Sequence, residues 1–165
     1  MSGIFNFSSL SLLSEEKKLT LKSFSINDAL EIGEIAKSLG NSKRLPIAIE
    51  VRIGNWIIYH ASLLGSTIEN QDWINRKANV VLLKKHSTLF ERVRAEEQGV
   101  NWYVENNLSE SLYAIHGGGL PLITKNYGFQ GVLLISGLPH VQDHFFGVEV
   151  LNKFLNRDME CDNYG

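Results

Sequence analysis

The chain has 165 residues, a formal net charge of -2 and a single cysteine, Cys161. This length suits one domain with a real core, and the charge gives none of the basic surface that nucleic-acid binding requires. A lone cysteine excludes both an intrachain disulfide framework and a thiolate zinc site.

The first elements alternate between helix and strand. Residues 8–18 predict a short helix, and residues 19–24 alternate apolar with polar side chains as a short strand does. A longer helix follows, in which either Ser25 or Asn27 can cap the first turn, and a Gly-Asn pair at 40–41 ends it.

A β-hairpin is the best supported local structure. Residues 47–53 alternate apolar with polar side chains, which predicts a strand with one buried face. Gly54 and Asn55 fit a tight two-residue turn, because glycine adopts positive φ at no steric cost. The return strand, residues 56–64, is rich in aromatic and β-branched side chains.

The second half of the chain carries the remaining elements. Residues 69–86 and 87–98 predict two helices, and 99–110 read as a loop with an apolar Trp-Tyr-Val centre that can pack on a neighbour. Three strands are predicted at 112–115, 120–124 and 130–137, and a closing helix at 140–156. The polar tail, 157–165, is expected to fray.

This order of elements predicts an α+β fold. Short turns join most strands, so we expect a mostly antiparallel sheet of five to six strands flanked by helices, as in profilin-like and PAS-like sandwiches. No repeat or linker divides residues 1–165, which read as a single domain. The start lacks a basic segment and no apolar run reaches the ~20 residues of a membrane span, so we expect a cytoplasmic protein that does not bind membranes.

The closing helix carries two apolar stripes. The stripe expected to face the sheet comprises Val141, Phe145, Val148, Leu151 and Leu155. The opposite stripe, Phe146, Val150 and Phe154, would be bare in a monomer. A second apolar stripe usually marks an interface, so we predict a homo-oligomer with these three residues at a subunit contact. The alternative is that the N-terminal segment covers them.

The residues that could carry chemistry lie at one corner of the sequence. His116 precedes Gly117 and Gly118, which would let a ligand approach backbone N–H groups, although a simple turn or bulge explains the glycines equally well. Asp143 and His144 open the closing helix, where Asp143 suits the helix dipole and His144 suits the core. The sharper hypothesis is that His116, Asp143 and His144 converge on one pocket that binds a metal, haem or an anion.

Two basic residues join these candidates. Arg76 and Lys77 lie beside Trp73 on a predicted helix. The Lys77 ammonium either reaches solvent or pairs with a carboxylate, from Asp143 or from a ligand. His60 lies on a predicted strand and receives no role.

The motifs at this corner resemble the haem-degrading-domain family (GlcG/HbpS-like). They are Gly-Gly-Gly-Leu-Pro at 117–121, Gly-Val-Leu at 131–133, Ile-Ser-Gly at 135–137 and Gln-Asp at 142–143. Two more segments resemble the short, stand-alone and uncharacterised branch of the family: Ala-Ile-His-Gly-Gly at 114–118 and Asp-Trp-Ile-Asn-Arg-Lys at 72–77. The resemblance covers roughly residues 24–155.

The resemblance implies a profilin-like sheet and symmetric oligomers, with haem bound by some members and haem degradation attributed to some. Gly117, Gly118 and Asp143 match the family pattern. His116 belongs to the short branch, and His144 stands where the wider family often has an acid.

Three functions fit these residues. The first is an oligomer that binds haem or a tetrapyrrole-like small molecule and can degrade it, which needs an axial histidine and a dry aromatic pocket. The second is a non-enzymatic oligomeric scaffold or interaction protein. The third is a metal hydrolase at His116, Asp143 and His144.

Overall fold

The structure, a computed structural model, describes residues 8–139 and 141–164. The helices are α1 (Ser9–Lys18), α2 (Ile26–Ser42), α3 (Ile68–Lys84), α4 (Thr88–Glu97), α5 (Trp102–Asn106) and α6 (Gln142–Tyr164). The strands are β1 (Ala48–Ile53), β2 (Trp56–Ser62), β3 (Gly119–Thr124) and β4 (Gly128–Ser136). They form an antiparallel sheet in the order β2-β1-β4-β3.

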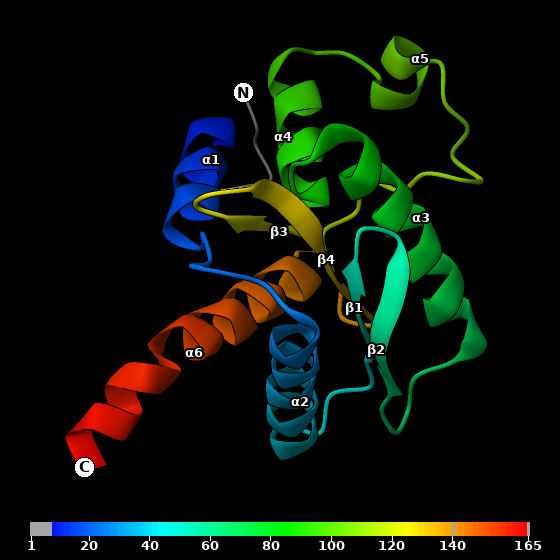
Figure 1. Ribbon diagram of the computed structural model, residues 1–165. Coiled ribbons are helices and arrows are strands. Elements are labelled where there is room, and N and C mark those ends of the chain that lie inside the picture. The colour runs from blue at the N-terminus through cyan, green and yellow to red at the C-terminus, as the bar shows by residue number, and fades with distance from the viewer. Residues whose placement is uncertain (1–7, 140, 165) are drawn as a thin grey trace.

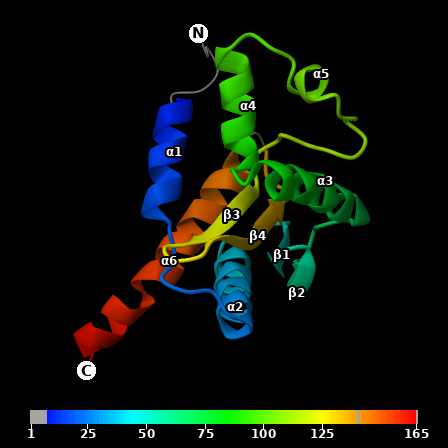
Figure 2. The ribbon, with the colours of Figure 1, turned by 45° about the horizontal axis from the view of Figure 1, so that its top comes forward.

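Helices cover both faces of this sheet. Helices α2 and α6 lie against each other on one face, and α3 covers the other (Figure 1). Helix α1 packs against α4 beside the β3 edge, as the turned view shows (Figure 2). None of the helices in the described ranges is long and apolar enough to cross a lipid bilayer.

The central position of β1 buries both of its faces. Ile49 and Val51 point into the core beneath α2 and α6, whereas Glu50 and Arg52 are buried on the α3 side. The prediction of a strand with one buried face is therefore wrong. Apolar and polar residues do alternate along β1, but α3 covers the polar face, so that face is buried too.

The predicted hairpin is confirmed, with Gly54 at φ 55° between β1 and β2. The predicted five to six strands are wrong, because two short segments do not join the sheet as strands. Residues 19–24 contribute only a bridge from Leu21 to Thr124. Residues 112–115 turn toward α3, where the Ala114 N–H donates to the Arg76 carbonyl at 3.1 Å.

Two other segments hold more helix than predicted. Residues 99–110 include α5, whose buried Trp102 donates its indole N–H to Glu91 of α4 at 2.9 Å. The closing helix is longer than predicted, since α6 continues to Tyr164. The predicted start of the closing helix, His140, lies outside the described residues.

The prediction of a bare stripe on α6 is wrong. Phe146, Val150 and Phe154 are buried in the main core within a single chain. Helix α6 lies across the sheet beside α2, so this stripe packs on both, and Phe145 of the other stripe is the exposed side chain. These three residues cannot form a subunit contact, and the homo-oligomer stays a prediction without them.

Candidate functional site

The structure brings the glycine corner to the start of α6. Gly118 has φ +125°, a conformation that glycine adopts without strain. A Cβ atom there would overlap the Ile135 carbonyl oxygen and would lie 2.8 Å from Lys77 Nζ and 3.0 Å from Asp143 Cβ. A Cβ atom on Gly117 would lie 3.2 Å from the Cβ of His144. Only glycine lets the chain approach α6 this closely.

A buried ion pair lies beneath this corner. Lys77 Nζ lies 3.2 Å from Asp143 Oδ2 and donates to the Ile135 carbonyl at 2.9 Å. Asp143 also accepts from the N–H of Leu138 at 2.9 Å and of Gly137 at 3.3 Å. Burial lowers the pKa of Lys77 and raises that of Asp143, and each charge opposes the shift of the other. Both groups are satisfied within the chain, so this pair joins α3 to α6.

His144 is covered by α1. Its side chain is only 2% exposed, and Nε2 lies 2.7 Å from Glu15 Oε1. Nδ1 is buried without a hydrogen-bond partner among the described residues. Glu15 thus occupies Nε2 and Nδ1 is enclosed, so neither nitrogen is open to a ligand in this structure.

His116, in contrast, is exposed at the surface. Its ring packs edge-on against Trp73, with 4.7 Å between ring centroids and 72° between ring planes. Desolvation by this packing lowers the pKa of His116 to about 4, with smaller contributions from the positive charges of Arg92, Lys77 and Arg76. The imidazole is therefore neutral near pH 7.

Arg76 completes a partly exposed cluster with these two rings, which we call the Trp73 cluster (Trp73, Arg76 and His116). The Arg76 guanidinium carbon lies 4.4 Å from the Trp73 ring centroid, and Nε donates to the Glu110 carbonyl at 3.0 Å. An aromatic face, a cation and a neutral imidazole thus lie together. Across the residues that the structure describes, no three His, Cys, Asp or Glu side chains are arranged to hold a metal ion, so the metal hydrolase has no support.

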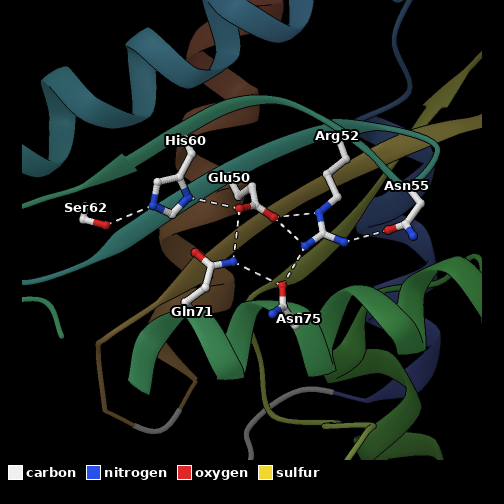
Figure 3. A network of polar contacts seen from close by, with 7 residues as sticks. All are labelled: Glu50, Arg52, Asn55, His60, Ser62, Gln71 and Asn75. Atoms are coloured by element: carbon white, nitrogen blue, oxygen red, sulfur yellow. Dashed lines mark hydrogen bonds and ion pairs between the residues drawn. The ribbon is translucent and has the colours of Figure 1, made fainter. Parts of the chain in front are cut away.

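The sequence analysis missed a second polar site, between β1, β2 and α3 (Figure 3). Glu50 is 1% exposed and accepts from Arg52 Nε at 2.6 Å. Arg52 also donates to Asn55 of the hairpin turn at 2.7 Å and to Asn75 of α3 at 3.0 Å. The buried charges of Glu50 and Arg52 therefore have partners on three elements.

This site continues outward along β2. His60 Nδ1 lies 3.0 Å from Glu50 Oε1, and His60 Nε2 lies 2.9 Å from Ser62 Oγ (Figure 3). Gln71 of α3 donates to the same Glu50 oxygen at 3.3 Å.

The predicted two-residue turn alone would place Glu50 opposite Tyr59. A β-bulge between Val51 and Arg52 shifts the register by one residue and places Glu50 opposite His60 instead, so the predicted hairpin could not reveal this contact. The burial of Glu50 was missed because we treated the polar face of β1 as solvent-exposed.

Comparison with known proteins gives both sequence and structural relatives. The family model for haem degrading protein HbpS-like matches residues 24–152. A UPF0303 protein of Streptomyces avermitilis is 35% identical over 146 residues, which cover 88% of this chain and 90% of that protein. A UPF0303 protein of Lactiplantibacillus plantarum is 34% identical over 140 residues, 85% of this chain and 90% of that protein.

Solved structures show the same fold at lower identity. The Ybr137w protein aligns with a TM-score of 0.83 and 24% identity, covering 91% of this chain and 89% of that one. A PduOC:heme complex aligns at 0.66 with 17% identity, covering 79% and 94%. HbpS aligns at 0.63 with 14% identity, covering 84% and 95%. The predicted α+β fold, an antiparallel sheet flanked by helices, is confirmed.

Proposed function

The chain belongs to the HbpS-like haem-degrading protein family, and on that premise we propose that it binds haem or a related tetrapyrrole with His116 as the iron ligand. The observation that carries the proposal is the exposed imidazole of His116, which lies in one cluster with the Trp73 ring and the Arg76 guanidinium. Iron binds the lone pair of a neutral imidazole, which protonation would remove. A structural relative, PduOC, has been solved with heme.

The rest of the Trp73 cluster suits the other parts of such a ligand. The Trp73 ring offers an apolar face to a planar macrocycle. The Arg76 guanidinium is a donor for a carboxylate substituent. Bound haem would supply iron redox chemistry, and the family name suggests oxidative degradation as the reaction.

The remaining predicted residues support the ligand indirectly in this proposal. Gly117 and Gly118 let the chain turn beside α6, and the Lys77–Asp143 pair holds that turn in place. We assign no ligand role to His144 in this proposal, because its buried imidazole contacts Glu15.

Titration of the purified chain with hemin tests the proposal. We expect a Soret shift in the wild type and at least about tenfold weaker binding in His116→Ala, since the lost iron–nitrogen bond is worth more than about 1.4 kcal/mol. His86→Ala is the matched control, because it removes a partly exposed imidazole elsewhere and should leave binding unchanged. No Soret shift in the wild type, or an equal shift in His116→Ala, would refute the ligation. Loss of the Soret band after adding a reductant in air would indicate degradation.

A second function, a non-enzymatic oligomeric scaffold, is supported by a different observation. Leu64 and Ile68, at the junction of β2 and α3, are 98% and 89% exposed. Exposed apolar side chains mark an interaction surface when they form a contiguous patch, and in this second function these two residues form one. Light scattering at micromolar concentration should then show an oligomer that Leu64→Asp with Ile68→Asp dissociates, whereas Leu10→Asp on α1 does not. A monomeric wild type would refute this function.

A further inference from the structure

The Glu50–His60–Ser62 chain has the composition and order of a hydrolase triad. We propose that Ser62 is a nucleophile activated by His60, and that the site takes small activated acyl esters. The proposal is independent of tetrapyrrole binding, because it uses none of the residues of the Trp73 cluster.

The contacts match the roles that a triad needs. Ser62 Oγ lies 2.9 Å from His60 Nε2, and His60 Nδ1 lies 3.0 Å from Glu50 Oε1 (Figure 3). A nucleophile within hydrogen-bond reach of a base, with that base oriented by a third group, is the recurring arrangement of activated serines.

The surroundings of Glu50 determine which nitrogen of His60 carries the proton. Its buried carboxylate accepts from Arg52 Nε at 2.6 Å and from Gln71 at 3.3 Å. An ionised carboxylate can only accept, so His60 Nδ1 must carry the proton of that contact. A neutral His60 then has its lone pair on Nε2, facing Ser62 Oγ. In this tautomer, the Ser62 hydroxyl donates to the atom that would remove its proton.

The open edge of the sheet gives access to the hydroxyl. Strand β2 is an edge strand, and Ser62 is exposed. The Leu63 N–H donates to the Ile47 carbonyl at 2.9 Å and so points inward. Successive residues of a strand point their N–H groups to opposite edges, so the Ser62 N–H points outward. It can donate to the oxygen of an approaching acyl carbonyl.

A purely structural network would not need the contact between His60 and Ser62. Glu50 and Arg52 are buried and require partners, and they find them in Gln71, Asn55 and Asn75. The His60 side chain is 33% exposed, so water could satisfy it and Ser62. The ordered contact of Ser62 with His60 is therefore additional to what burial demands.

The reaction balances with an ester and water alone. Ser62 Oγ attacks the acyl carbon and its proton passes to His60 Nε2, which then protonates the departing alkoxide as the ester C–O bond breaks. Water repeats the sequence on the acyl-serine, releasing a carboxylic acid and restoring the hydroxyl. Glu50 stays ionised throughout and stabilises the imidazolium.

Labelling of the full chain with an alkyl fluorophosphonate tests this proposal. We expect one adduct, mapped to Ser62 by peptide mass spectrometry and absent from Ser62→Ala. His60→Asn should slow labelling by about 100-fold, the usual size of a general-base contribution. Ser111→Ala is the matched control: that exposed hydroxyl contacts the Ser109 hydroxyl and no imidazole, so its loss should change nothing.

A second readout separates nucleophile activation from a structural role. The wild-type labelling rate should rise with pH along a single ionisation that His60→Asn abolishes, while circular dichroism shows both proteins folded. Labelling of Ser62 and Ser111 at equal rates would overturn the proposal. An unchanged rate in His60→Asn, or an adduct on His60 itself, would do the same.

Discussion

At the scale of single residues, the Lys77–Asp143 pair fixes the glycine corner. Its side chains are 3% and 6% exposed, so both charges have left water. Their mutual attraction and the backbone contacts with Ile135 and Leu138 offset that desolvation. Removing one partner would leave the other charge buried and unpaired.

Lys77→Met should therefore destabilise the protein by about 3–5 kcal/mol, the usual cost of breaking a buried pair. The double variant with Asp143→Asn should recover part of that loss. Lys43→Met is the control: its pair with Glu149 is 46% and 41% exposed, so we expect a loss below about 1 kcal/mol. Urea denaturation measures all three, and equal losses for Lys77→Met and Lys43→Met would contradict this account.

His116 should titrate far below an ordinary histidine. Its pKa falls from 6.5 to about 4 on folding, so between these values only the unfolded chain binds the proton. Stability should accordingly decline as pH falls from 6.5 toward 4, and less so in His116→Ala. NMR titration of the imidazole measures the pKa directly. In Trp73→Ala, which removes the desolvating ring, it should return toward 6.5; a wild-type midpoint near 6.5 would disprove the effect.

The environment of a single side chain could be predicted where chemistry allowed only two possibilities. Lys77 lay on an apolar helix face, so it had to reach solvent or meet a carboxylate, and the structure shows the contact with Asp143. The Glu50 network was not predicted, because alternating apolar and polar residues show only that the two faces of β1 differ in polarity. They do not show whether a helix covers the polar face.

At the scale of elements, α2 approaches β2 closely through Gly33. A Cβ atom at this position would overlap the Tyr59 ring. Gly33→Ala would ordinarily favour a helix by up to about 1 kcal/mol. Here the overlap should prevail and destabilise the protein by about 1–3 kcal/mol, as overpacking does.

Thermal denaturation of Gly33→Ala tests this packing. Ser38→Ala, on the exposed side of the same helix, is the control and should be neutral or slightly stabilising. A melting temperature of Gly33→Ala at or above the wild type would show that α2 can shift away from Tyr59 without cost.

Elements were predictable where the two segments in contact are neighbours along the chain. The Gly54 turn joins two adjacent strands, so pattern and turn together specified the hairpin. Residues 19–24 and 112–115 are short and apolar, but no neighbouring turn or strand in the sequence indicates which strand they would pair with. Their conformation depends on tertiary contacts. In residues 112–115, for example, the Ala114 N–H donates to a carbonyl of α3 and not to a strand.

At the scale of the whole molecule, the sheet order separates a rigid centre from an open edge. Strands β1 and β4 are central and buried, whereas β2 forms an edge with mostly exposed side chains. The orientation of α6 belongs to this scale too. Its two stripes were both visible in the sequence, and its placement beside α2 buries Phe146, Val150 and Phe154 while Phe145 of the other stripe stays exposed.

Amide hydrogen exchange should therefore be slowest in β1 and β4, and within β2 it should alternate. The Leu63 N–H, bonded to Ile47, should exchange slowly, whereas the Ser62 N–H, pointing to the open edge, should exchange quickly. Leu63 is thus an internal control one residue away. If Ser62 is protected as strongly as Leu63, or becomes so as protein concentration rises, then the edge is covered and the access that we infer for an acyl ester does not exist.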